Sequence, residues 1–112
     1  MFRIQKRIEI AGAHHLNLPY ESKCRNVHGH SWILTIYCQA SDEAVEANNG
    51  MVIDFTNIKE VVMRLDHSDL NQILEENPTA ENIARWICLH TLYCYQVDVQ
   101  ESEGNIATYV VD

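Results

Sequence analysis

Three histidines in the first third of the chain have the spacing of a metal site. His28 and His30 are two residues apart in a segment of strand character, so both side chains point to one face. Neutral imidazole is a common zinc ligand, and catalytic zinc keeps three protein ligands and an open position. His14 ends an earlier strand in phase with its apolar face, and His15 is the rival third ligand. Each histidine alone is more simply a core residue, but the three together predict a zinc site.

Cys24 differs from the other cysteines of the chain. It lies in a polar segment four residues before His28, between Lys23 and Arg25. Positive neighbours lower the pKa of a thiol and raise its thiolate fraction, so this position indicates a reactive thiol. The remaining cysteines are Cys38, Cys88 and Cys94. They lie in apolar periodic segments without a Cys-x-x-Cys pair, which favours small core residues over a disulfide framework.

Two further segments hold carboxylates that could act with these groups. Asp66 precedes His67 after a predicted helix. A carboxylate beside an imidazole can orient it and raise its basicity, although such a pair can equally be a solvated helix end. Glu101 falls in phase with the apolar residues of a predicted strand. A buried carboxylate needs a partner, which Arg85, Lys59 or a ligand could supply.

Period-two alternation predicts the strands that would carry these residues. The first two strands cover residues 2–14 and about 28–39, each with one apolar side. A short strand is expected at 51–53. Two closing strands, with apolar residues from Val97 and from Ile106 to Val111, would form a hairpin around a turn at 103–105. The segments 17–27 and 41–50 are interpreted as loops.

Helical spacing predicts two helices. One runs from Phe55 to Leu65 with Asp54 as its N-cap. The other runs from about Thr79 to Tyr95, with Pro78 suited to its first turn. The order ββ(β)ααββ predicts an α+β fold in one domain over 1–112, an antiparallel sheet with two helices packed on one face.

Charge and hydropathy exclude several classes of function. The net charge is −8 with only eight Lys and Arg residues, and a nucleic-acid binder needs a basic face. No apolar run reaches about 18 residues, so no transmembrane helix is expected. The charged start lacks a following apolar region, which argues against a signal peptide and makes the cytoplasm the expected location.

Five segments, in order, resemble the 6-pyruvoyl-tetrahydropterin synthase superfamily. They are Ala13-His14-His15-Leu16 with Cys24-x-x-x-His28-Gly29-His30, Gly50-Met51-Val52-Ile53-Asp54-Phe55, Leu65-Asp66-His67 with Leu70-Asn71, Asn77-Pro78-Thr79-Ala80-Glu81-Asn82, and Glu101. The three-residue gap after the cysteine is most similar to the bacterial 6-carboxy-tetrahydropterin synthases of 7-deazaguanine and queuosine synthesis. Ile10 and Gly12 depart from the family pattern, and the loop between His14 and Cys24 is one residue shorter.

The resemblance implies a role for each matched residue. His14 would be the third zinc ligand beside His28 and His30, and Cys24 the thiol that abstracts a proton. The implied acid–base pair, usually reaching in from a neighbouring subunit, is Asp66 with His67. The implied substrate-binding residues are Glu101, which would anchor the pterin, Thr79 and Glu81.

The activity implied is a zinc-dependent lyase that converts 7,8-dihydroneopterin triphosphate to 6-carboxy-5,6,7,8-tetrahydropterin, losing triphosphate and acetaldehyde. The alternatives are a 6-pyruvoyl-tetrahydropterin synthase, a side-chain cleavage that gives another pterin, and a non-catalytic zinc- and pterin-binding protein. The fold implied is the tunnelling fold, assembled as a homohexamer (a dimer of trimers) with active sites between subunits. Lys23, Arg25 and the N-terminal basic group are the only obvious residues to meet a triphosphate.

Overall fold

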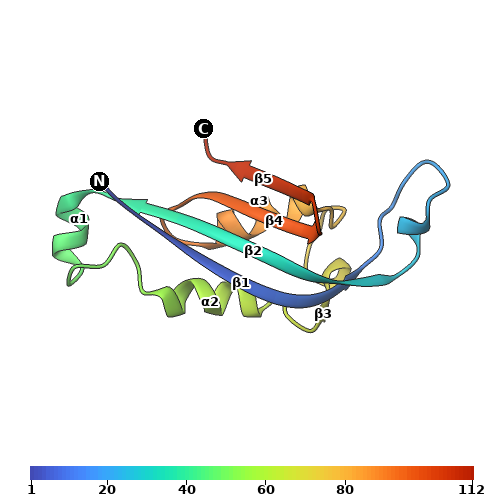
Figure 1. Cartoon of the computed structure of the whole chain (residues 1–112), viewed down its shortest axis with the longest axis horizontal. Helices are drawn as coiled ribbons and strands as arrows, with labels where there is room; N and C mark the ends of the chain where they lie inside the picture. Colours follow the sequence, from blue (N-terminus) through green and yellow to red (C-terminus); the bar gives the residue numbers. More distant parts are fainter.

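Five strands form one sheet in the computed structural model, which describes residues 1–112 (Figure 1). The sheet order is β3-β1-β2-β4-β5. Its centre is the long antiparallel pair of β1 (Phe2–His14) and β2 (His28–Ala40). β4 (Cys94–Ser102) pairs with β2, and β5 (Asn105–Val110) pairs with β4, both antiparallel. β3 (Ser68–Asp69) adds a short parallel edge to β1.

Helices pack against one face of this sheet, as Figure 1 shows. α2 (Phe55–Met63) lies along β1, and α3 (Ala80–His90) lies behind β4 and β5. α1 (Asp42–Ala47) follows the end of β2. Two 3-10 turns, η1 (Lys23–Arg25) and η2 (Leu70–Gln72), complete the elements. The predicted α+β architecture, with two main helices on one face, is confirmed.

The alternation of each strand decides which side chains the helices cover. The even-numbered residues of β1 and β2 face the helices, and Trp32, Leu34 and Ile36 are fully buried there. Ile58 of α2 and Ile87 of α3 close the same core. We call this side the covered face. The odd-numbered residues of β1 and β2 form the open face, which no helix covers.

Side-chain caps explain where the two main helices begin. Asp54 accepts a hydrogen bond from the Thr56 N–H at 2.9 Å, as the sequence predicts. The Thr79 hydroxyl accepts from the Asn82 N–H at 3.1 Å and is the N-cap of α3. Pro78 therefore precedes the cap and does not stand in the first turn.

Three sequence predictions about elements are wrong. α3 ends at His90 and does not continue to Tyr95, because the chain turns through Tyr93 with a φ of 63° before β4 begins. No strand forms at 51–53, where Val52 and Ile53 make a buried bend, since an apolar run can serve a packed loop as well as a strand. The loop expected at 41–50 contains α1, which Ser41 caps through the Ala44 N–H.

All four cysteines are free thiols. Cys38 and Cys88 are buried in the core, as predicted, and burial raises the pKa of Cys88 to about 12. Cys94 is half-buried, and a hydrogen bond with the Cys38 thiol raises its pKa. Cys88 and Cys94 are therefore protonated at neutral pH. No helix of the structure is long and apolar enough to cross a membrane.

Candidate metal centre and catalytic residues

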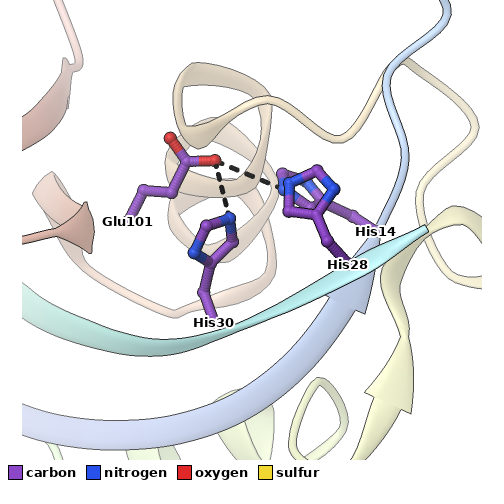
Figure 2. Close-up of side chains that lie close together, drawn as sticks. All are labelled: His14, His28, His30 and Glu101. Carbon is purple, nitrogen blue, oxygen red and sulfur yellow. Dashed lines mark ion pairs between the residues drawn. The ribbon is translucent and has the colours of Figure 1, made fainter. Parts of the chain in front are cut away.

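The predicted histidines converge at the end of the long strand pair. His14 and His28 are direct partners in the β1–β2 register, and His30 lies two residues further on the covered face. Glu101, near the end of β4, joins them. One ligand atom from each of the four residues lies within 4.8 Å of every other (Figure 2). His15, the rival third ligand, is not part of this group.

Trp32 forms the inner wall of the histidine group. Its ring centroid lies 4.9 Å from that of His14 and 5.1 Å from that of His30. The indole N–H donates to the Gly12 carbonyl at 3.0 Å, which fixes the ring. A Cβ on Gly12 would come within 3.3 Å of both Leu70 and the Trp32 nitrogen. Gly12 therefore suits this position because the indole and Leu70 pack directly on its backbone.

Backbone carbonyls set the tautomer of two of the histidines. His14 Nδ1 lies 2.7 Å from the Pro78 carbonyl, and His28 Nδ1 lies 2.7 Å from the Asn26 carbonyl. A carbonyl can only accept, so each Nδ1 carries a proton and donates. Each Nε2 then presents a lone pair. Metal-binding histidines are commonly oriented in this way by an acceptor on the far ring nitrogen.

Glu101 brings a negative charge against the Nε2 atoms of two histidines. Its Oε1 lies 3.3 Å from Nε2 of both His14 and His30, and neither nitrogen has a hydrogen-bond partner. Burial lowers the pKa of His14, despite the raising effect of the Pro78 hydrogen bond, so the ring is neutral near pH 7. A carboxylate facing a neutral acceptor nitrogen is unfavourable unless a cation lies between them.

The spacing of these atoms fits a metal ion. Tetrahedral ligands about 2.0–2.1 Å from a zinc ion lie about 3.3–3.4 Å apart. The separation of Glu101 Oε1 from the two Nε2 atoms is 3.3 Å. His14, His28, His30 and Glu101 could therefore hold a metal ion.

Of the partners considered for Glu101, neither Arg85 nor Lys59 pairs with it, and a ligand stays a prediction. Arg85 donates to Asn82 at 2.8 Å, and Glu101 contacts histidines where Arg85 or Lys59 was expected. The alternation of β4 correctly predicts that the Glu101 carboxylate points inward. No local sequence pattern predicts its contact with the ends of β1 and β2.

Beside Glu101 lies a hollow of about 370 Å³, and Glu81 also lines it. Thr79 is not among its lining residues, and its hydroxyl caps α3.

Cys24 lies in η1, in the loop that joins β1 to β2. Its N–H donates to the Ser22 hydroxyl at 3.1 Å, and its carbonyl accepts from the Leu16 N–H at 2.7 Å. The thiol is half-buried and lies outside the group of metal-ligand atoms. Of its two basic neighbours, Arg25 is paired with Glu21 at 3.4 Å.

The basic N-terminal group lies far from this region. Arg7, its nearest member, stands seven residues before His14 in the same strand. At about 3.3 Å per residue it is roughly 23 Å away. Within one chain, Lys23 and Arg25 are therefore the cations closest in sequence to the histidine group.

Asp66 and His67 form a pair at the outer edge of β1. Asp66 Oδ2 lies 2.9 Å from His67 Nδ1, and Asp66 Oδ1 accepts from the Ala11 N–H at 2.9 Å. The Ala11 and His67 contacts hold the pKa of Asp66 below its usual value. His67 has a φ of 53°, and its N–H donates to the Ala11 carbonyl at 2.7 Å. A non-glycine residue in this left-handed region needs such fixed contacts.

The pair does not meet the histidine group within one chain. His67 borders a hollow of about 490 Å³ whose other lining residues include Ala11, Ala13 and Ser31 of the open face. His30 also borders this hollow, but its Nε2 lies 3.3 Å from Glu101 Oε1 on the covered face. His14 and His30 point to the covered face. The β1–β2 layer therefore separates the two sets of imidazoles.

Two parts of the site were not predicted from the sequence. The Pro78 and Asn26 carbonyls that orient the histidines are backbone groups, and any residue type supplies a carbonyl. Trp32 could have been found, because it is in phase with His28 and His30 on the same strand.

A family model described as 6-pyruvoyl tetrahydropterin synthase matches residues 3–111. The chain belongs to this family. Because the match spans nearly the whole chain, it includes every residue of the histidine group, Cys24 and the Asp66–His67 pair.

Several members of the 6-pyruvoyl tetrahydropterin synthase family are similar to the chain. It is 41% identical over 95 residues to 6-carboxy-5,6,7,8-tetrahydropterin synthase of Synechocystis sp., covering 78% of this chain and 72% of the relative. It is 36% identical over 89 residues to dihydroneopterin monophosphate aldolase of Pyrococcus furiosus, covering 76% and 70%. The solved structure of Caenorhabditis elegans 6-pyruvoyl tetrahydropterin synthase superposes with a TM-score of 0.76 at 23% identity, covering 99% and 96%.

The predicted family and fold class are therefore confirmed, and with them the prediction of a lyase of this family. The C. elegans structure, at its level of identity, supports the fold alone.

Proposed function

We propose that the chain is a zinc-dependent 6-carboxy-tetrahydropterin synthase acting in queuosine and 7-deazaguanine biosynthesis. It would convert 7,8-dihydroneopterin triphosphate to 6-carboxy-5,6,7,8-tetrahydropterin, with loss of triphosphate and acetaldehyde, in the cytoplasm. The observation that carries the proposal is the convergence of three imidazoles beside a carboxylate, with two of their Nε2 atoms buried and unpartnered. The 41% identity to the Synechocystis synthase supports the product.

Zinc would be held by His14, His28 and His30, a donor set of three imidazoles that suits catalytic zinc. When bound, it supplies a Lewis acid that lowers the pKa of the substrate hydroxyls. The chain's own contribution is to bury His14, which keeps that imidazole neutral, and to orient His14 and His28 through the Pro78 and Asn26 carbonyls.

Two groups would move protons. Cys24, as a thiolate, would remove a proton from the substrate side chain. His67 would serve the opposite transfer through Nε2, because Asp66 holds its Nδ1. The imidazole is 83% exposed on the far side of the β1–β2 layer from its own chain's histidine group. We therefore propose that His67 acts in the site of a neighbouring subunit of a homohexamer, a dimer of trimers.

Glu101 would anchor the pterin. A carboxylate can accept two parallel hydrogen bonds from the N–H edge of the amino-pyrimidinone ring. Its side chain is 29% exposed and borders the hollow that Glu81 also lines, which gives a flat ring access. Glu81 would contact the substrate there, and Thr79 would support the site by starting α3 at this point.

A second candidate is the cleavage of dihydroneopterin monophosphate. Two observations favour it. The chain is 36% identical to the Pyrococcus furiosus aldolase of that name, and only Lys23 and Arg25 adjoin the site in sequence to meet a triphosphate. A monophosphate needs fewer cations.

Product analysis separates these functions. Metal-loaded protein would be incubated with dihydroneopterin triphosphate and, separately, with the monophosphate, and the pterins identified by mass spectrometry. The proposal expects 6-carboxy-tetrahydropterin and acetaldehyde from the triphosphate, and none with the Cys24→Ala variant. A hydroxymethyl pterin from the monophosphate would establish the second candidate. A 6-pyruvoyl product without acetaldehyde, or no product, would contradict the proposal.

A further inference from the structure

The edge of β1 that faces away from β2 continues beyond the end of the sheet. At residues 12 and 13 it is paired by β3. Beyond that point the partners are asparagine side chains. The His15 N–H donates to Asn71 Oδ1 at 2.8 Å, and Asn71 Nδ2 donates to the His15 carbonyl at 3.0 Å. The Asn17 N–H donates to Asn77 Oδ1 at 2.9 Å, and Asn77 Nδ2 donates to the Asn17 carbonyl at 3.2 Å.

Each asparagine thus imitates one residue of a neighbouring strand. A carboxamide carries one acceptor and a donor group, as a peptide unit does. His15 and Asn17 are two residues apart, so their N–H and C=O groups point to the same edge of an extended chain. We call the two asparagines the amide clamp.

The opposite edge of the clamped segment holds Cys24. The residue between His15 and Asn17 is Leu16, and its N–H donates to the Cys24 carbonyl at 2.7 Å. The remaining backbone hydrogen bonds of η1 are local, from Arg25 to Ser22 and from Asn26 to Lys23. The main-chain link from Cys24 to the rest of the fold therefore passes through Leu16.

The clamp is itself tied to the metal ligands. The Asn77 carbonyl accepts from Asn82 Nδ2 and from the Thr79 N–H, both at 2.8 Å, so it is fixed to the start of α3. The next residue, Pro78, accepts from His14 Nδ1 at 2.7 Å. One short segment thus orients a metal ligand and, through Asn17 and Leu16, the loop with the thiol.

We propose that Asn71 and Asn77 are positioning residues that hold the Cys24 loop in register with the histidine group. The inference rests on the proposed role of Cys24 as the base. The two asparagines would act through the main chain of the Cys24 loop and would not touch the substrate. A clamp that only seals the sheet edge would affect stability but neither the exposure of Cys24 nor the turnover of folded enzyme.

The test compares Asn71→Ala and Asn77→Ala in metal-loaded protein. The matched control is Asn48→Ala, because Asn48 Nδ2 also donates to a main-chain carbonyl, that of Met51, in the segment that follows α1. The rate of Cys24 alkylation by iodoacetamide, mapped by mass spectrometry, should rise roughly 10- to 30-fold in both clamp variants, the factor that the loss of two net hydrogen bonds is worth. The kcat should fall on the order of 10²-fold with KM and metal content unchanged. The control should match wild type.

Folded clamp variants with an unchanged alkylation rate at Cys24 would overturn the proposal, whatever their activity. If an alanine variant does not fold, Asn71→Asp keeps the acceptor for the His15 N–H, loses the donor and is held to the same outcome. The alkylation rate needs no substrate. An error in the proposed function would instead appear as full activity in Cys24→Ala, so the two failures are distinguishable.

Discussion

The chain places two kinds of imidazole on opposite sides of one strand pair. On the covered face, His14 is fully buried and His30 is 23% exposed, and their Nε2 atoms have no hydrogen-bond partner. At the open face, His67 is 83% exposed and its Nδ1 is held by the ionised Asp66. Histidine side chains therefore occupy a buried and an exposed environment on the two sides of the same strand pair.

The difference shows what each environment suits. Burial disfavours the protonated ring, and backbone carbonyls fix its tautomer, so the covered face presents lone pairs to a cation. Asp66 holds Nδ1 of the open-face ring, and exposure leaves its second nitrogen free, which suits the exchange of protons with a substrate. The two sets are complementary, but the sheet separates them within one chain.

The largest effect should come from breaking the covered-face group. His28→Ala or His30→Ala should lose metal affinity by more than about 100-fold, since even outer-shell partners of ligands are worth roughly 10- to 100-fold. Elemental analysis of purified protein would measure it, with about one zinc per chain expected in wild type. His15→Ala and His67→Ala are the controls and should keep the metal. Full retention by both ligand variants would refute the metal site.

A smaller effect should separate pterin binding from metal binding. Glu101→Gln keeps the shape but loses the charge, and a hydrogen bond to a charged group is worth about 1.5–3 kcal/mol. Pterin affinity should therefore fall roughly 10- to 100-fold in a titration, with metal content unchanged. Loss of the metal together with unchanged pterin affinity would make Glu101 a metal ligand and remove its anchor role.

The smallest effect concerns the stability that Asp66 gives to the open-face pair. The Ala11 N–H and His67 lower its pKa below the unfolded value of about 3.9. Its carboxylate therefore stabilises the fold above about pH 4, and this contribution is lost as pH falls through the folded-state pKa. Urea unfolding of wild type and Asp66→Asn should differ most near pH 7 and converge below pH 4. A difference that persists in acid would mean that the carboxylate charge is not its source.

Strand phase made the histidine group predictable. His28 and His30 share a face by the two-residue period, and His14 continues the apolar side of its strand. The sequence could not state that His14 and His28 are paired, because register depends on the whole length of two strands. Glu101 was placed inward by the same reasoning, but its contacts lie across the sheet and have no local pattern.

Elements with weak patterns were missed. α1 has six residues and one buried side chain, Val45, so it lacks a helical stripe. β3 has two residues, too few for alternation to appear. Residues 51–53 were predicted as a strand on an apolar run that instead fills a packed bend. The amide clamp could not be predicted from the sequence, because Asn71 and Asn77 form hydrogen bonds with the main chain of residues far away in sequence.

Complementation between two inactive variants tests the central claim, that the two faces act together across subunits. Cys24→Ala and His67→Ala would be purified separately, dissociated, mixed in equal amounts and reassembled, with tagged pull-down to confirm mixed oligomers. If each site takes Cys24 from one chain and His67 from another, about a quarter of the sites in a random mixture are intact. The account predicts activity near that fraction of wild type, above either variant alone. Mixed oligomers whose activity stays at the level of the single variants would contradict it.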